Sequence, residues 1–240
     1  MQLFYTYKIQ QGLAFLDEEE SRHLQTVLRR KEGDRLQLTD GKGAFFTGTI
    51  ESAGKKEVIV RIESERSAPP RSATQLHIAM APTKQIERFE WFLEKAAEIG
   101  VDAVTPLLCE RSERRQIRSD RLEKILQSAM KQSLQAWLPR LQPLTPFESV
   151  VKNAAEPIRC IAWCGETAVP HLADVLQPGK AVLALIGPEG DFSPEEVALA
   201  LASGFQAVNL GPSRLRTETA GLYAVTTVNL SAREKNKATT

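Results

Sequence analysis

Two glycine-proline loops in the last quarter of the chain carry residue types that could bind a small ligand. The first is Ile186-Gly187-Pro188-Glu189-Gly190-Asp191-Phe192, and the second begins at Leu210-Gly211-Pro212. Each follows a short apolar run that predicts a strand, and each precedes a pattern that predicts a helix. Open α/β sheets bind ligands at the carboxyl ends of their strands, so two such units in succession indicate an enzyme with a pocket formed by both loops.

The composition of these loops favours a flat, neutral ligand over a phosphate group. Glycine lets a ligand approach the main chain, and proline stiffens a loop and removes a hydrogen-bond donor. The phosphate-binding pattern G-x-x-x-x-G-K-[ST] is absent from the sequence. Gly41-Lys42-Gly43 lies among strand-like runs and indicates a hairpin turn. We therefore expect an adenine ring read by main-chain groups, with plain turn chemistry as the alternative for either loop alone.

Charged and hydroxyl side chains follow the second loop. Arg216-Thr217-Glu218-Thr219 begins the last helical pattern, which places Glu218 near the positive end of the helix dipole. Such groups beside a glycine loop could position a nucleophile. A helix-capping salt bridge between Arg216 and Glu218 would explain the same residues without any function.

Charge and cysteine content exclude several other classes of protein. The net charge of the 240 residues is +1, so an anionic partner must be met by local basic clusters. Two clusters stand out, although each could be a solvated face: Arg29, Arg30 and Lys31, and then Arg111, Arg114, Arg115, Arg118 and Arg121. The cysteines and histidines lack metal-ligand spacing, so we expect no metal site and buried free thiols at Cys109, Cys160 and Cys164. No signal-peptide pattern and no membrane-length apolar run is present, which predicts a cytoplasmic protein with no membrane partner.

A proline break at Ser67–Ser72 separates two regions of different pattern. Before it, short strands are expected at 35–39, 44–50 and 57–62, with a short helix capped by Asp17 or Ser21, which predicts a small β-barrel. After it, strands at 76–81, 103–108, 158–164, 181–186 and 207–210 alternate with helices, which predicts a mostly parallel sheet. Helices are expected from Gln85 to Gly100, from Asp120 to about Trp137, and from Ser193 to Gly204.

The chain resembles, over nearly its whole length, the RsmE family of bacterial 16S ribosomal RNA uracil-N3 methyltransferases, which belong to the SPOUT superfamily. The matching blocks are His23-Leu24, Val27-Leu28-Arg29, Gly33-Asp34, Asp40-Gly41, Lys84, Glu94–Val101, Arg111-Ser112-Glu113, Ala129, Gln132-Ser133, Gly187-Pro188-Glu189-Gly190, Leu210-Gly211 and Leu215–Ala220. Two departures are visible. Asp191 stands where the family usually has a second glycine, and Trp137 stands where an arginine is common.

The resemblance implies an α/β fold: a SPOUT trefoil-knotted methyltransferase domain at residues 73–240, preceded by a small PUA-like β-barrel domain at residues 1–70. It implies a homodimer built on the larger domain and S-adenosylmethionine as the cofactor. The cofactor pocket would then be formed by Trp163, Cys164, Gly165, Glu166, Ile186, Gly187, Pro188, Gly190, Leu210, Gly211, Leu215, Arg216 and Thr219.

The implied reaction needs the proton on uracil N3 to be removed. Arg216 is expected to orient the base or stabilise its anion, and Glu218 or Glu189 to act as general base. The implied 16S ribosomal RNA substrate, within the small subunit, would be bound through Arg29, Arg30, Lys31, Lys84, Arg111, Arg114, Arg115 and Arg118. Two alternatives remain open: a ribose 2′-O methyltransferase of the same superfamily, and a non-catalytic RNA-binding or ribosome-assembly factor.

Overall fold

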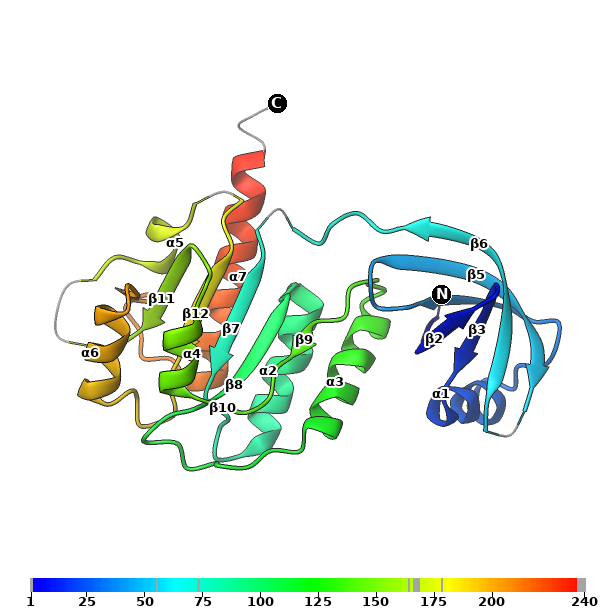
Figure 1. The fold of residues 1–240 in the computed structure, drawn as a ribbon, viewed down its shortest axis with the longest axis horizontal. Coiled ribbons are helices and arrows are strands. Elements are labelled where there is room, and N and C mark those ends of the chain that lie inside the picture. Colours follow the sequence, from blue (N-terminus) through cyan, green and yellow to red (C-terminus); the bar gives the residue numbers. More distant parts are fainter. Residues whose placement is uncertain are drawn as a thin grey trace. The chain divides into compact units, whose positions relative to one another are not determined.

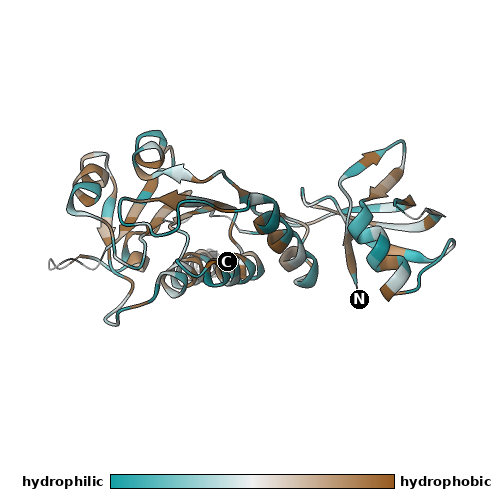
Figure 2. Ribbon diagram, turned by 90° about the horizontal axis from the view of Figure 1, so that it is seen from below, coloured by the Kyte–Doolittle hydropathy of each residue, from teal (hydrophilic) through white to brown (hydrophobic). Residues whose placement is uncertain are grey.

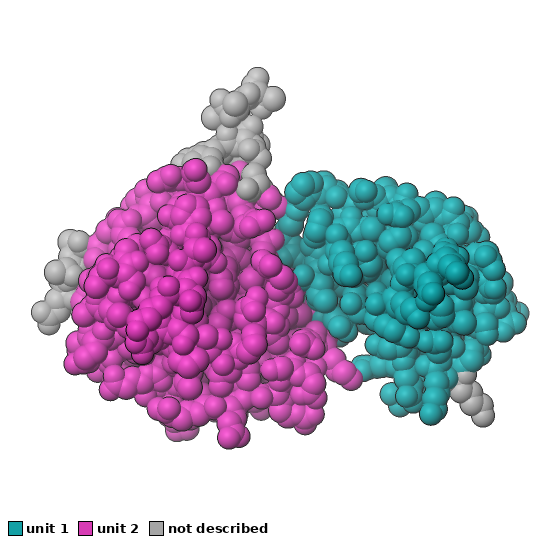
Figure 3. All heavy atoms as spheres, viewed as in Figure 1, with its two compact units in different colours: residues 1–71, 127–138 teal, residues 72–126, 139–240 magenta. Residues whose placement is uncertain are grey.

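The computed structural model describes residues 2–54, 56–72, 74–163, 165, 169–177 and 179–236. These residues form two compact units, which Figure 3 colours separately. The smaller contains residues 1–71 and 127–138, and the larger contains residues 72–126 and 139–240. The first boundary lies beside the proline break. The inclusion of residues 127–138 in the smaller unit was not expected from the sequence.

The smaller unit is a curled sheet with strand order β1-β4-β5-β6-β3-β2 (Figure 1). Its strands are β1 (Leu3–Tyr5), β2 (Lys8–Gln10), β3 (Leu13–Leu16), β4 (Arg35–Thr39), β5 (Ala44–Ala53) and β6 (Val58–Ser67). The edge strands β1 and β2 are consecutive in the chain and meet at buried Thr6. The amide of Thr6 donates a hydrogen bond to the carbonyl of Thr39 in β4, and its hydroxyl donates one to the carbonyl of Phe15 in β3. The chain itself therefore joins the two edges, which gives the sheet its barrel-like form.

A short helical segment covers this sheet. It consists of α1 (Glu18–Arg22) followed by the π-helical turn η1 (His23–Val27). The carboxylate of Asp17 accepts a hydrogen bond from the amide of Glu20, which confirms the predicted cap. Buried Ser21 accepts a hydrogen bond from the amide of Val58 and so ties the helix to β6.

Trp137 is an anchor of the smaller unit. Its indole Nε1 donates a hydrogen bond to the carbonyl of Pro69 at 2.9 Å. Residues 136–138 also pair with the β4–β5 hairpin through two backbone hydrogen bonds of 2.8 Å. The amide of Gly43 donates to the carbonyl of Ala136, and the amide of Leu138 donates to the carbonyl of Gly41. Gly43 has φ +100°, and a Cβ there would overlap the indole ring of Trp137. The G-x-G motif is thus a hairpin turn, as predicted, whose second glycine makes room for a tryptophan from far along the chain.

We expect Gly43→Ala to destabilise the protein by roughly 1–3 kcal/mol, because the new methyl group must displace the Trp137 ring and because φ is positive. Chemical denaturation measures the loss. Gly12→Ala is the matched control, since Gly12 also has positive φ (+77°) in this unit but has no atom within 4 Å of an added Cβ. Equal losses in the two variants would show that Trp137 does not require this glycine.

The larger unit is built on a parallel sheet with strand order β10-β8-β7-β12-β11-β13, with β9 also pairing with β8. Its strands are β7 (Leu76–Met80), β8 (Ala103–Leu108), β9 (Arg140–Leu141), β10 (Thr145–Pro146), β11 (Ile158–Ala162), β12 (Val182–Ile186) and β13 (Gln206–Val208). The predicted parallel sheet is confirmed. Its central strands are buried on both faces, as their continuous apolar runs predict. Figure 2 shows brown, hydrophobic stretches on strands of both units.

Helices cover both faces of this sheet (Figure 1). They are α2 (Ile86–Ile99), α4 (Phe147–Asn153), α5 (Leu172–Val175), α6 (Pro194–Ala202) and α7 (Thr217–Asn236). Helix α3 (Ser119–Gln132) begins in the larger unit and ends in the smaller one. Helices α4 and α6 pack on a core that includes Ala79, Leu183 and Phe192, while α2 and α7 pack together on the opposite face beside β7. No helix in the described part of the chain is long and apolar enough to cross a membrane.

The helix ends follow local signals in most places. Helix α2 begins after Gln85 and ends at Gly100, and α6 carries the predicted Ser193–Glu196 capping box. The prediction for α3 was wrong at its C-terminus, because the helix ends at Gln132 and not near Trp137. Leu134 adopts φ +55°, and the amide of Gln135 bonds back to the carbonyl of Met130, which is a Schellman-type ending without glycine. This early end frees residues 136–138 to pair with the hairpin.

Two of the three cysteines are buried free thiols, as expected. Burial raises the pKa of Cys160 to about 12 and raises that of Cys109 further. Both groups are therefore protonated and unreactive at neutral pH. Cys164 lies outside the described residues.

His77 links three elements at the amino edge of the parallel sheet. Its Nδ1 lies 2.8 Å from Glu156 Oε1, and its Nε2 lies 2.7 Å from Thr105 Oγ1. The hydrogen bond from His77 lowers the pKa of Glu156. A pocket of ≈ 200 Å³ opens beside this cluster and is also lined by Asp102 and Arg140. Its lining includes the first residues of β7, β8 and β12, so it lies at the edge opposite the glycine-proline loops.

We expect Glu156→Gln to reduce stability at neutral pH but not in acid. A folded-state pKa below the unfolded value means that the stabilisation is present above the unfolded pKa, about 4.3, and is lost as pH falls through the folded value. Urea denaturation of wild type and variant at pH 7 and at about pH 3.5 measures this. A difference in the free energy of unfolding that is the same at both pH values would contradict the linkage.

Candidate functional site

Four strands of the parallel sheet end at the same level. Ile186 of β12 pairs with Met80 of β7 and with Ala162 of β11, and Ala162 pairs with Val208 of β13. The loops that follow β7, β11, β12 and β13 therefore leave the sheet side by side. The register of the backbone hydrogen bonds brings together the two glycine-proline loops that the sequence predicted to be neighbours.

The first loop is a tight turn after β12. Ile186 and Pro188 are buried, while Glu189 and Gly190 are exposed. A Cβ on Gly187 would lie 3.2 Å from the ring of Phe192, so this glycine permits the loop to fold back on its own aromatic residue. Phe192 also packs against Phe147 of α4, with ring centroids 5.4 Å apart. Phe192 therefore anchors the loop in the hydrophobic core between the sheet and helices α4 and α6.

Asp191 adopts the left-handed conformation, with φ +60°. Its amide bonds to the carbonyl of Pro188 at 3.0 Å, and its carboxylate accepts from the amide of Phe192 at 2.8 Å. Glycine enters this region freely, and aspartate is among the few other residues that tolerate it. The aspartate thus adopts a backbone conformation that glycine, the family's usual residue here, enters freely.

The second loop, after β13, lies against residues 169–172. The amide of Asn209 donates to the carbonyl of Pro170, its side chain donates to that of Val169, and its own carbonyl accepts from the amide of Leu172. The Asn209 side chain also accepts from the amide of Gly211, which has φ +104°. The C-terminal chain is thereby fixed against an earlier loop. Among the described atoms, none lies within 4 Å of a Cβ built on Gly211, so its face is open.

Arg216 and Glu218 flank the start of α7 but differ in their surroundings. Arg216 is exposed, and its carbonyl accepts from the amide of Ala220 in the first turn. Glu218 is buried, and its Oε1 lies 3.9 Å from Nε of Arg88 on α2. The predicted capping salt bridge between Arg216 and Glu218 does not occur; Glu218 pairs with Arg88 instead. Leu215 is half-buried and Thr219 is exposed beside them.

Ionic and hydrogen-bond contacts tie the first loop to the segment before α2. Glu189 accepts a hydrogen bond from the amide of Lys84 at 2.8 Å, and the ammonium of Lys84 pairs with Glu113, which raises the pKa of Lys84. Arg114 donates to the carbonyls of Thr83 and Lys84. The loop after β7, which contains Lys84, is therefore part of the same site.

Arginines of the segment 111–118 form hydrogen bonds within the protein as well as carrying positive charge at its surface. Arg111 donates to the carbonyls of Gly190 and Phe192 and lies across Gly190. Arg115 donates to the carbonyl of Glu110, and Arg118 pairs with Asp120 at 2.8 Å. The sequence could not distinguish these internal contacts from a phosphate-binding face, because the same exposed guanidinium groups serve for both.

The predicted RNA-contacting residues of the smaller unit are all exposed. Arg29, Arg30 and Lys31 follow η1, and Arg29 has φ +55°. Arg30 lies 3.9 Å from Asp34, a weak surface pair. These side chains are free to meet a polyanion.

The remaining predicted cofactor residues follow β11. The amide of Trp163 donates to the carbonyl of Val208, and a Cβ on Gly165 would overlap the Trp163 ring. Cys164 and Glu166 lie outside the described residues. Sequence reasoning missed Asn209 and Arg88. An asparagine directly before Leu210-Gly211 is a turn signal that could have been used, whereas nothing local indicates Arg88.

Two family models match the chain. An RNA methyltransferase domain covers residues 70–229, and an RNA methyltransferase PUA domain covers residues 16–63. The fold and the site thus define an RNA methyltransferase of the SPOUT type with an N-terminal PUA-like domain. The chain is 32% identical to the ribosomal RNA small subunit methyltransferase E of Synechocystis over 86% of this chain and 69% of that protein.

Solved structures agree in fold over almost the whole chain. A "probable rRNA-methyltransferase" of Porphyromonas gingivalis is 45% identical with a TM-score of 0.91, covering 98% of this chain and all of that one. A ribosomal RNA small subunit methyltransferase E of Neisseria gonorrhoeae, solved bound to S-adenosyl methionine, is 28% identical with a TM-score of 0.83, covering 94% and 95%. The chain belongs to the ribosomal RNA small subunit methyltransferase E family, the RsmE family that its motifs resembled.

Proposed function

We propose that this methyltransferase transfers the methyl group of S-adenosylmethionine to N3 of one uridine in 16S ribosomal RNA. The observation that carries the proposal is the common level at which β7, β11, β12 and β13 end, since it gathers both glycine-proline loops beside Arg216 and Glu218. Family membership supports the small-subunit ribosomal RNA as substrate. The choice of N3 comes from the resemblance of the motifs.

The residues present fit S-adenosylmethionine. Gly211 offers an open face at the mouth of the second loop, and Gly190 is exposed in the first loop, with Gly187 half-buried near it. We assign the adenosine to this main chain, bounded by Ile186, Pro188, Leu210 and Leu215, with Trp163 and Gly165 at the adjoining strand end. When bound, the cofactor supplies an activated methyl group on a positively charged sulfur. The protein then needs to supply position, a dry pocket and a deprotonated acceptor.

We expect Gly211→Ala to weaken S-adenosylmethionine binding at least tenfold while the protein stays folded, because the added methyl group occupies the open face. Isothermal titration calorimetry measures the affinity. Gly179→Ala is the matched control, because Gly179 also has positive φ (+69°) and no atom within 4 Å of an added Cβ, but lies away from both loops. Unchanged affinity in folded Gly211→Ala would place the pocket elsewhere.

The mechanism requires removal of the proton on uracil N3. Glu218 is our first candidate for the base, because it lies at the start of α7 and its ion-pair partner Arg88, at 3.9 Å, is too distant to donate a hydrogen bond to it. Glu189 is the weaker candidate, since it already accepts the amide of Lys84. Arg216 is exposed and unpaired among the described side chains, so it can donate to O2 or O4 of the uracil anion.

We expect Arg216→Ala to slow methyl transfer by about 10²–10³-fold with a smaller effect on cofactor affinity, as for loss of one anion-stabilising donor. Glu218→Gln should be slow at neutral pH and recover partly as pH rises, because hydroxide can then take the proton. Single-turnover kinetics across pH, with thermal melts beside them, measures both. Lower melting temperatures with wild-type transfer rates would show that the two residues are structural.

The base must leave its pairing partner before N3 can react, because N3 lies on the Watson–Crick edge. We assign the flanking RNA to Arg29, Arg30 and Lys31 in the smaller unit and to Lys84, Arg115 and Arg118 in the larger. Arg111 and Arg114 also brace the loops, so their loss should weaken both cofactor and RNA binding. Phosphate contacts make RNA affinity fall with added salt.

Mass mapping of methylated nucleotides tests the function. Small-subunit RNA from cells with and without the protein should differ by one N3-methyluridine. A missing 2′-O-methyl group would favour the ribose methyltransferase, and identical RNA would favour a non-catalytic assembly factor. The intact glycine loops support the first outcome.

We further propose that the enzyme works in the cytoplasm, where ribosomes are assembled, and that it acts as a homodimer through the larger unit. Ala224 and Val225 of α7 are buried within the chain and therefore cannot supply the interface. The exposed large apolar residues of α2 and α7 are Trp91, Ile99, Tyr223 and Leu230, and these remain for a partner. Light scattering at micromolar concentration measures the mass.

A further inference from the structure

The first turns of α2 and α7 face each other at unusually close range. A Cβ on Gly221 of α7 would lie 2.6 Å from Sδ of Met80 and 2.8 Å from the ring of Phe92, so only glycine permits this approach. Arg88 precedes Phe92 by four residues, and Glu218 precedes Gly221 by three. Residues at these spacings share one face of a helix. The close contact at Gly221 therefore places Arg88 and Glu218 opposite each other, one turn nearer the site.

Among the described residues, Glu218 forms an ion pair with Arg88. Nε of Arg88 lies 3.9 Å from Oε1 of Glu218, which is an ion pair but too long for a hydrogen bond. The Glu218 side chain is only 11% exposed, whereas that of Arg88 is 36% exposed. The guanidinium thus lies near a mostly buried carboxylate without forming a hydrogen bond to it.

We propose that Arg88 is a positioning residue for methyl transfer, which holds the carboxylate of Glu218 toward the substrate at the mouth of the Leu210–Arg216 loop. The inference rests on the proposed function, because it assigns Arg88 a role through the candidate base. A carboxylate with free rotation about its side-chain bonds would spend little time in the reactive geometry. The guanidinium of Arg88, on a neighbouring helix, restricts this rotation of the carboxylate. Such restriction matters because a misplacement of a catalytic group by about 1 Å can cost about 10²-fold in rate.

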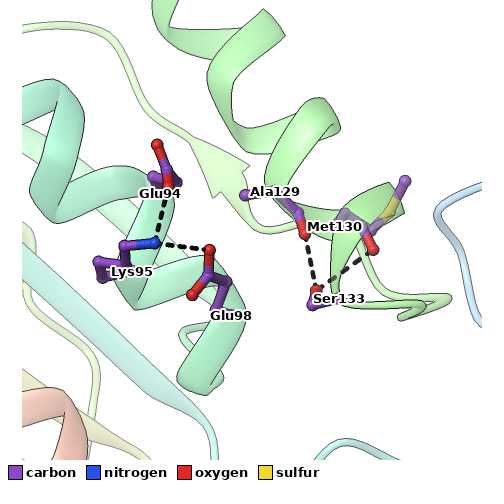
Figure 4. Close-up of polar contacts among 6 residues, drawn as sticks. All are labelled: Glu94, Lys95, Glu98, Ala129, Met130 and Ser133. Atoms are coloured by element: carbon purple, nitrogen blue, oxygen red, sulfur yellow. Dashed lines mark hydrogen bonds and ion pairs between the residues drawn. The ribbon is translucent and has the colours of Figure 1, made fainter.

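A helix-packing salt bridge is the competing explanation, and the chain offers a control for it. Lys95 lies on the same helix and pairs with Glu94 at 2.7 Å and Glu98 at 3.0 Å (Figure 4). Its side chain is 33% exposed, close to the value for Arg88. Both of its partners belong to α2 itself, so Lys95→Ala removes a cation of similar exposure from α2 without touching α7 or the loops.

The test is single-turnover methylation of small ribosomal subunits from cells that lack the protein, with radiolabelled S-adenosylmethionine, at saturating concentrations of both. The variants are Arg88→Ala, Arg88→Lys, Glu218→Gln, the double variant Arg88→Ala with Glu218→Gln, and Lys95→Ala. We expect Arg88→Ala to slow transfer by about 10- to 10²-fold with the KM for subunits and the cofactor affinity within about threefold of wild type. Arg88→Lys should recover part of the rate, since it keeps the charge but not the planar fork.

The double variant tests directly whether Arg88 acts through Glu218. If Arg88 acts through Glu218, the double variant should be no slower than Glu218→Gln alone. Multiplied losses, a wild-type rate in Arg88→Ala, or a loss confined to KM or cofactor affinity would overturn the proposal. So would a wild-type rate in Glu218→Gln, or unfolding of Arg88→Lys as well as Arg88→Ala. Failure of the proposed function itself is distinguishable, because it would appear as no N3-methyluridine made by wild-type protein.

Discussion

The shared register of four parallel strands is the constraint on which the site depends. Backbone hydrogen bonds align Met80, Ile186, Ala162 and Val208, so the loops that follow must emerge together. The loops contain glycine and proline because they must turn at once and expose main chain. The C-terminal loop is then bonded by Asn209 to residues 169–172. The proposed binding of the cofactor through main chain needs few charged side chains in the pocket, which matches the absence of a phosphate-binding lysine pattern from the sequence.

Charged residues around the loops serve two purposes. Arg111 and Arg114 donate to main-chain carbonyls of the loops on either side, and Glu189 accepts an amide from the segment before α2. Such contacts link loops that have no common secondary structure. Arg115, Arg118 and the Arg29–Lys31 cluster remain at the surface. A protein with a net charge of +1 can thus have local positive surface, which we propose meets RNA, while other arginines order its own loops.

The smaller unit shows how one segment can complete a domain to which it does not belong in sequence. Residues 136–138 pair with the 41–43 hairpin, and Trp137 occupies the space that Gly43 leaves. Lys131 of the same segment pairs with Glu20 of α1. A chain that begins after the proline break would leave these partners exposed. Loss of activity in such a truncated chain therefore cannot be ascribed to missing RNA contacts alone.

Local patterns determined much of this protein. Strands β4 and β8, helix α2 between Gln85 and Gly100, the α6 capping box and both glycine-proline loops could be read from spacing and turn residues, because each depends on neighbours within a few positions. The RsmE motifs added the family and the order of domains. Tertiary structure alone decided three features. Helix α3 ends early, Arg111 and Arg114 donate hydrogen bonds to loop carbonyls, and Glu218 pairs with Arg88 rather than with Arg216. These depend on contacts between segments 30 or more residues apart in the sequence, or on the close approach of two helices at Gly221, and no periodicity within one segment carries that information.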